Sequence, residues 1–75
     1  MKRLKRNFAV CVNNKGYPVS LELRKLYQVI PDEQAARLGQ LRVVDESGEN
    51  YLYPEQYFAP IQLPLDTERA VLRAP

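Results

Sequence analysis

The supply of cross-linking residues constrains this fold more than any other feature of the sequence. The 75 residues include one cysteine, Cys11, and no histidine. A chain of this size buries only about 60% of the surface that its unfolded form exposes, and small domains often rely on disulfides, metals or oligomerisation. Here an intramolecular disulfide cannot form, and a zinc site would need carboxylates almost alone. The fold must therefore depend on apolar packing, to which a homo-oligomer would add.

The composition is that of one small globular domain. The chain is 45% hydrophobic and 27% charged, and no apolar stretch approaches the ~20 residues that span a bilayer. A lone cysteine is typical of a reducing compartment. The basic start is not followed by the apolar segment of a signal peptide. We therefore expect a cytoplasmic location and no membrane partner.

The positive charge is concentrated at the start of the chain. Four of the eleven basic residues lie at positions 2–6, which leaves seven basic against nine acidic side chains in the rest. We expect residues 1–6 to form a basic, flexible N-terminus. One interpretation is a solvated terminus, and the other is a phosphate-binding segment made of Lys2, Arg3, Lys5 and Arg6.

Alternation of apolar and polar residues predicts five strands, at residues 7–13, 17–30, 41–46, 49–53 and 59–63. Within the second strand the alternation changes phase near Arg24 and Lys25, which indicates a bulge or a sharp bend. Ser47 and Gly48 separate two strands and predict a hairpin. These strands define a domain at residues 7–64.

Three segments have helical signals. Asp32 is a suitable N-cap for a short helix at residues 33–38, and Gly39 would end that helix. Residues 54–58 suit a single 3₁₀ turn. The tail, residues 65–75, has two interpretations: a helix capped at Asp66 or Thr67, or a disordered segment.

Two resemblances extend this interpretation. Residues 47–61, with Pro-Glu-Gln-Tyr at 54–57 before Phe58, resemble the end of a Src-homology-3-like barrel, where a distal hairpin leads to a Pro-Ser-Asn-Tyr tetrad. This implies an all-β fold, a small five-stranded Src-homology-3-like barrel with one short helix or helical turn. In peptide-binding members the matching proline and tyrosine line a polyproline groove, which also needs a tryptophan, and this chain has none.

The second resemblance covers most of the chain. The segments 11–13, 16–17, 20–22, 25–27 and 45–54, the last being Asp-Glu-Ser-Gly-Glu-Asn-Tyr-Leu-Tyr-Pro, are similar to a family of short, uncharacterised bacterial proteins. The resemblance implies a bacterial, cytoplasmic setting and assigns no activity.

Catalytic patterns are absent from the sequence. Cys11 has no histidine to act as its base, so we expect it to be a small buried apolar residue. The acidic group Asp45, Glu46 and Glu49 lacks the spacing of a calcium loop. No Gly-rich phosphate loop, Gly-x-Ser-x-Gly elbow or Cys-x-x-Cys pair occurs. We therefore predict no enzyme activity, no cofactor and no metal site.

The tyrosines carry the functional prediction. Tyr51 and Tyr53 share one face of their strand, opposite Leu52. Such rings either fill and rim a thin core or form a binding surface. We predict a non-enzymatic module that binds a partner protein through an aromatic barrel surface made of Tyr27, Tyr51, Tyr53, Pro54 and Tyr57. The alternative is an accessory RNA- or DNA-binding barrel that uses the basic N-terminus and the tyrosines.

Overall fold

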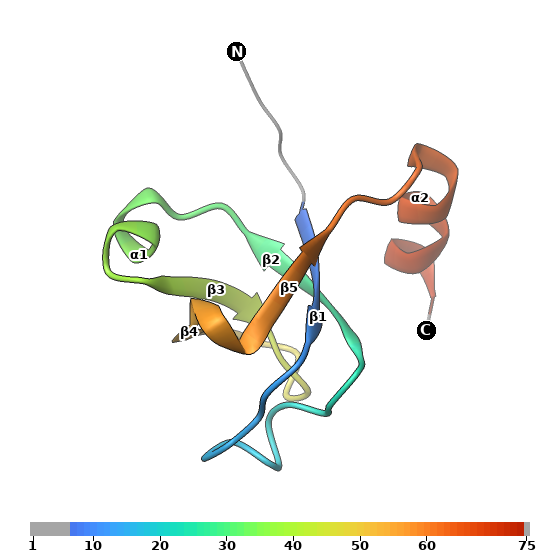
Figure 1. Ribbon diagram of the computed structural model, residues 1–75. Helices are drawn as coiled ribbons and strands as arrows, with labels where there is room; N and C mark the ends of the chain where they lie inside the picture. The colour runs from blue at the N-terminus through green and yellow to red at the C-terminus, as the bar shows by residue number, and fades with distance from the viewer. Residues whose placement is uncertain (1–6, 75) are drawn as a thin grey trace.

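The computed structural model describes residues 7–74, which form a mostly β fold (Figure 1). Its elements along the chain are β1 (Asn7–Cys11), β2 (Leu26–Ile30), α1 (Glu33–Arg37), β3 (Gln40–Val44), β4 (Asn50–Pro54), the 3₁₀ turn η1 (Glu55–Tyr57), β5 (Phe58–Ile61) and α2 (Leu65–Arg73). The predicted β class, the five strands and the short helix before β3 are confirmed. No helix among the residues described is long and apolar enough to cross a membrane.

The five strands form one sheet in the order β4-β3-β2-β1-β5, and every neighbouring pair is antiparallel. Within residues 7–74, β4 pairs only with β3, and β5 pairs only with β1. The sheet therefore does not close, and the predicted barrel is not confirmed. The turn η1 connects the two edge strands directly, which brings both ends of the sheet close in sequence.

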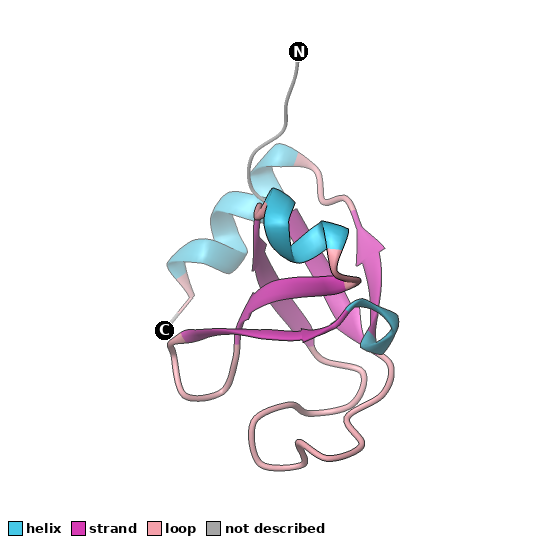
Figure 2. Cartoon of the chain, turned by 90° about the vertical axis from the view of Figure 1, so that its left-hand side faces the viewer, coloured by secondary structure: helices cyan, strands magenta, loops and turns pink. Residues whose placement is uncertain are grey.

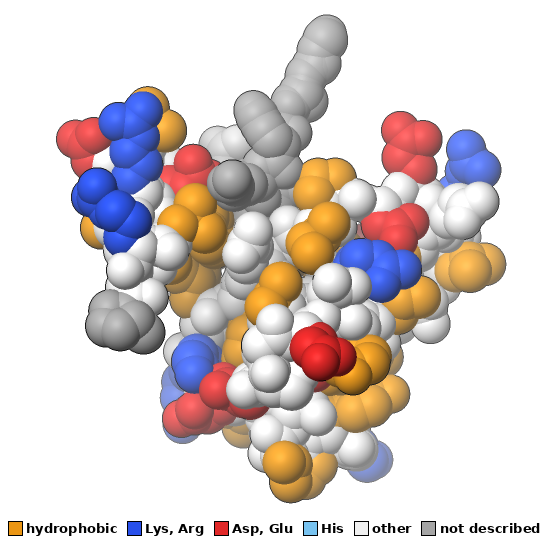
Figure 3. All heavy atoms as spheres, turned by 180° about the vertical axis from the view of Figure 1, so that it is seen from behind, with side chains coloured by type: hydrophobic (Ala, Val, Ile, Leu, Met, Phe, Trp, Pro, Cys, Tyr) orange, Lys and Arg blue, Asp and Glu red, His pale blue; other side chains and the backbone are white. Residues whose placement is uncertain are grey.

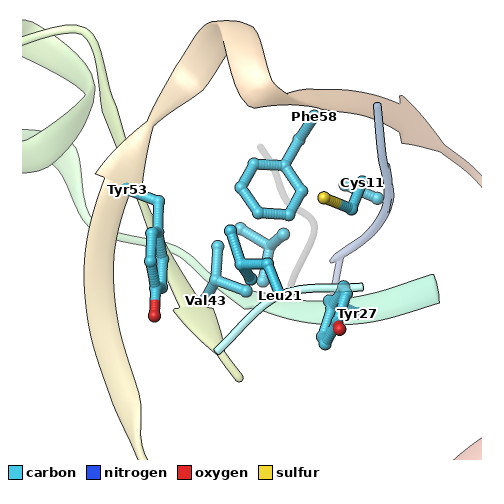
Figure 4. Packing of buried hydrophobic residues seen from close by; sticks show 8 residues of the cluster. Cys11, Leu21, Tyr27, Val43, Tyr53 and Phe58 are labelled. Carbon is cyan, nitrogen blue, oxygen red and sulfur yellow. The ribbon is translucent and has the colours of Figure 1, made fainter. Parts of the chain in front are cut away.

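The core lies on one face of this sheet. It consists of Ala9, Cys11, Leu21, Tyr27, Val29, Val43, Tyr53 and Phe58. Figure 4 shows Leu21, Val43 and Phe58 between the rings of Tyr53 and Tyr27. In β1 the small residues Ala9 and Cys11 belong to this cluster, so the smaller side chains of the alternating strand face the core. Cys11 is a buried free thiol, as predicted.

The second predicted strand, at residues 17–30, is confirmed only over β2, because residues 17–25 belong to a long loop at residues 12–25. The polar groups of the loop bond within it: the Leu21 amide donates to the Tyr17 carbonyl at 3.0 Å, and the Asn14 side-chain amide donates to the Leu21 carbonyl at 2.9 Å. Val19 and Leu21 would lie on the same face of a strand, but Leu21 is fully buried whereas Val19 is 89% exposed. The alternation of apolar and polar residues in this segment therefore does not correspond to a buried and an exposed face. The phase change marks a sharp turn in which Arg24 adopts φ 64°.

Both helices have identifiable ends. The Asp32 carboxylate accepts from the Ala35 amide at 3.0 Å, and Gly39 adopts φ 71° after the helix, so both predicted boundary residues of α1 are confirmed. The tail is helical, but the predicted cap is wrong. The N-cap of α2 is Pro64, and Asp66 and Thr67 lie within the helix.

The long loop and the β3–β4 hairpin lie together at one end of the molecule, and α1 and α2 lie toward the other (Figure 2). A hydrogen bond from the Glu46 amide to the Ser20 carbonyl, 3.1 Å long, joins the loop to the hairpin. This loop end collects most of the tyrosines and is where a candidate site is found.

Candidate binding surface at the loop end

An exposed aromatic surface occupies the loop end. We use the name tyrosine surface for Tyr17 in the long loop, Tyr51 in β4, and Tyr57 in η1. The predicted Pro54 pairs with Gln40, at the end of β4 away from the hairpin turn. Tyr51 is 50% exposed and Tyr17 is 39% exposed, while Pro54 and Tyr57 are half-buried. The long loop and the continuous segment of β4 and η1, which are distant in the sequence, thus contribute to one surface.

The packing of the rings fixes the geometry of this surface. The Tyr17 ring lies edge-on to Tyr53, with 4.9 Å between centroids and 87° between planes, and 6.2 Å from the Tyr57 ring at 69°. The Tyr57 hydroxyl donates to the Lys15 carbonyl at 2.8 Å, and the Tyr57 carbonyl accepts from the Val12 amide at 2.8 Å. Ring packing and hydrogen bonds therefore both join η1 to the long loop.

Two of the residues predicted for the binding surface lie elsewhere. Tyr27 is 5% exposed and Tyr53 is 3% exposed, and both belong to the core. Tyr51 and Tyr53 share one face of β4, and this face is exposed to solvent at Tyr51 and buried in the core at Tyr53. The two buried rings cannot be the exposed anchors that the sequence suggested, and of the two it is Tyr53 that packs against the Tyr17 ring of the surface.

Each buried tyrosine donates its hydroxyl to a carboxylate at the start of the β3–β4 hairpin. Tyr53 Oη donates to Asp45 Oδ2 at 2.5 Å, and Tyr27 Oη donates to Glu46 Oε2 at 2.5 Å. The two carboxylates differ in their other partners. Lys25 Nζ pairs with Glu46 Oε2 at 2.6 Å. Asp45 Oδ1 accepts from the amide and the hydroxyl of Ser47, at 2.9 Å and 2.5 Å.

These contacts change the acidity of all four groups. Burial and the hydrogen bond to Asp45 raise the pKa of Tyr53 to about 12, and burial and the bond to Glu46 also raise the pKa of Tyr27. Burial acts to raise the pKa of Asp45, but hydrogen bonds from Ser47 and Tyr53 outweigh it and lower that pKa. Hydrogen bonds from Lys25 and Tyr27 lower the pKa of Glu46. Both carboxylates are therefore charged at neutral pH.

A hollow of about 470 Å³ opens beside Asp45. Its lining combines rings, hydroxyls and one carboxylate, from Tyr17, Ser20, Asp45, Ser47, Tyr51, Leu52 and Tyr53. Ser20, Asp45 and Ser47 are not among the residues predicted for the binding surface, and Asp45 was considered only as part of the acidic group that lacks the spacing of a calcium loop. The available signal was the hairpin motif around Ser47, which indicated a turn and not the loop that packs beside it.

The basic residues of the alternative function lie outside the described part of the chain. Lys2, Arg3, Lys5 and Arg6 all precede residue 7, so nucleic-acid binding through them stays a prediction. On the face drawn in Figure 3, the Lys and Arg side chains are scattered among acidic and hydrophobic ones. In residues 7–74, no three side chains of the His, Cys, Asp or Glu type converge as metal ligands do.

Comparison with known proteins gave no relative for this chain. No family model, no curated protein and no solved structure matches it. The arguments about its role therefore start from the residues of the loop end.

Proposed function

We propose that this protein is a non-enzymatic interaction module that binds a partner protein through the tyrosine surface. The observation that carries the proposal is the exposure of Tyr17, whose ring packs against two other rings, and of Tyr51, which lines the same hollow. Tyrosine is enriched at the energetic centres of protein interfaces because its ring supplies apolar area and its hydroxyl supplies a polar contact.

The packing of the surface also favours binding. The Tyr17 ring lies against two other rings, and the hydroxyl of Tyr57 is bonded to the loop backbone. A side chain that is already ordered loses little conformational entropy when a partner covers it. Tyr17 and Tyr57 are therefore better anchors than equally exposed but isolated side chains would be.

We further propose that the fold is an open version of the Src-homology-3-like arrangement. Support comes from the strand order β4-β3-β2-β1-β5, the long loop after β1 and the 3₁₀ turn before β5. The tyrosine surface lies between that loop and that turn. The chain contains no tryptophan, so the proposal does not extend to polyproline ligands. The expected setting is the bacterial cytoplasm.

Affinity capture with matched variants tests the proposed function. The tagged full chain is incubated with lysate of its source organism and washed at about 0.5 M NaCl, which screens exposed charge pairs. We expect a defined protein to be retained by the wild type and lost with the double variant Tyr17→Ser and Tyr51→Ser. The control is Leu38→Ser, because Leu38 is 74% exposed beside α1, away from the loop end.

The same experiment has outcomes that contradict the proposal. Equal retention by the wild type and the double variant would show that the tyrosine surface is not the interface. Retention of nucleic acid at low salt alone, lost when residues 2–6 are removed, would favour the alternative function.

A further inference from the structure

We propose that the hollow beside Asp45 is a subsite for a lysine side chain of the partner protein. The inference deepens the proposed function and rests on it for the source of the lysine. It is carried by three features of the hollow: a buried carboxylate without a cationic partner, an acceptor position that this carboxylate still offers, and surroundings of aromatic rings and a second carboxylate.

The first feature is the uncompensated charge of Asp45. Its residue is 6% exposed, yet its described hydrogen bonds come only from neutral groups, on Ser47 and Tyr53. Neither of the two ion pairs found within residues 7–74 includes it. The carboxylate is held as an anion by neutral donors, whereas the neighbouring Glu46 has Lys25 as its counterion. A cation supplied by a ligand would give Asp45 the charge partner that it lacks within residues 7–74.

The second feature is the number of acceptor positions that Asp45 still offers. A carboxylate has about four lone-pair positions, and three hydrogen bonds are in place, two on Oδ1 and one on Oδ2. One position on Oδ2 is left. A guanidinium binds a carboxylate best through two parallel bonds, whereas an ammonium is a compact charge that needs a single acceptor. The carboxylate therefore suits lysine better than arginine.

The third feature is the surroundings of this carboxylate. The rings of Tyr17, Tyr51 and Tyr53 line the hollow, and such rings attract a cation and cover an aliphatic stem. At the rim, the Tyr51 hydroxyl donates to Glu49 Oε1 at 3.2 Å, which adds a second carboxylate without a cationic partner among the described residues. The hollow thus matches both parts of a lysine side chain, its four-carbon stem and its ammonium group.

The test is an NMR titration of the ¹⁵N-labelled full chain with two probes. One probe is Nα-acetyl-lysine N-methylamide, and the other is Nα-acetyl-norleucine N-methylamide, which lacks the ammonium group. We expect the lysine probe to shift the amides of Tyr17, Ser47 and Tyr51 with a millimolar Kd, and the norleucine probe to bind about tenfold more weakly. Raising NaCl from about 0.05 M to about 0.5 M should weaken the lysine probe several-fold.

Variants separate the features of the site. Asp45→Asn removes the charge with little change of shape, and we expect it to abolish the difference between the probes. Glu33→Gln removes one carboxylate from α1, at the other end of the molecule, and should leave binding unchanged. Tyr51→Leu should weaken the lysine probe about threefold. If Asp45→Asn does not fold, Tyr51→Leu and the two probes on the wild type decide the question.

Several results would overturn the inference. They are equal shifts by both probes, no shift by either probe at about 50 mM, and unchanged lysine binding by a folded Asp45→Asn variant. The titration needs no partner protein, so it is independent of the capture experiment. Lysine binding without a captured partner would retain the subsite and reject the interaction module. Capture of a partner that depends on Tyr17 and Tyr51, without a response to the lysine probe, would support the interaction module and reject the lysine subsite.

Discussion

Two tyrosine–carboxylate pairs use neighbouring carboxylates of the hairpin, Asp45 and Glu46, but differ in their environment. Tyr27 donates to Glu46, which also pairs with Lys25. Tyr53 donates to Asp45, whose other donors are the amide and hydroxyl of Ser47. In the first pair, the negative charge of Glu46 has a counterion from the same chain, Lys25. The second has three neutral donors and no counterion among the ion pairs of residues 7–74.

This difference separates a structural role from a functional one. The Tyr27 pair joins β2 to the hairpin, with the Glu22 amide donating to the Tyr27 hydroxyl at 2.8 Å, and it is not part of the lining of the hollow beside Asp45. The Tyr53 pair lines the hollow under Tyr17 and Tyr51. Natural proteins tend to leave a buried polar or charged group without its full set of partners at functional sites. Among residues 7–74, Asp45 is the buried carboxylate that lacks a counterion.

Removing either ring should give the largest effect and should not distinguish the pairs. Tyr53→Ala and Tyr27→Ala each delete a core ring, at a cost of about 3–5 kcal/mol, which is most of the stability of a domain of this size. Urea unfolding followed by circular dichroism measures the loss. Tyr51→Ala, two residues away on the exposed part of β4, is the control and should change the midpoint little. A small loss in Tyr53→Ala would mean that its ring is not part of the core.

Removing only the hydroxyls should distinguish the pairs. Tyr53→Phe takes a donor from a buried carboxylate and should cost about 1.5–3 kcal/mol, the range for hydrogen bonds to charged groups. Tyr27→Phe should cost less, about 1 kcal/mol, because Glu46 keeps Lys25 and is partly exposed. The reverse order in urea unfolding would contradict the idea that Asp45 depends on its neutral donors.

Much of the framework could be predicted from the sequence because its signals are local. The hairpin at Ser47 and Gly48, the cap at Asp32 and the turn before Phe58 each depend on a few adjacent residues. The segment at residues 17–23 was misread because its structure depends on distant groups. The amide of Glu46 bonds to Ser20 from the hairpin, and Leu21 is buried in a core that other elements build.

The candidate site could be predicted only in part for the same reason. The aromatic content was visible, and Tyr51 and Tyr57 do lie on the tyrosine surface. Which rings are buried was not visible, since Tyr51 and Tyr53 have the same parity in one strand and differ by 47 percentage points in exposure, at 50% and 3%. That difference arises because Tyr53 packs beside Phe58, with 6.3 Å between ring centroids.

Acid should affect both pairs, and salt should tell them apart. The pKa values of Asp45 and Glu46 are lowered in the folded state, so each contributes stability above the ordinary carboxylate pKa of about 4, and that contribution is lost as the pH falls through the lowered value. Salt screens the Lys25 pair and should raise the pKa of Glu46, but it should change that of Asp45 little. Carboxyl ¹³C titrations at two NaCl concentrations measure both, and equal salt responses would contradict the difference.

The smallest expected effect comes from Lys25→Met, which gives Glu46 the same lack of a counterion that Asp45 has. The pair is exposed at both ends, with side chains 46% and 33% accessible, so its contribution to stability is small and screened by salt. We expect a slight fall of the urea midpoint that disappears at about 0.5 M NaCl. Lysine binding in the hollow should become slightly tighter in the same variant, because the positive charge that pairs with Glu46 is removed. An unchanged or weaker lysine affinity would show that the charge of Glu46 does not reach the hollow, and that Asp45 and Glu49 alone supply its negative field.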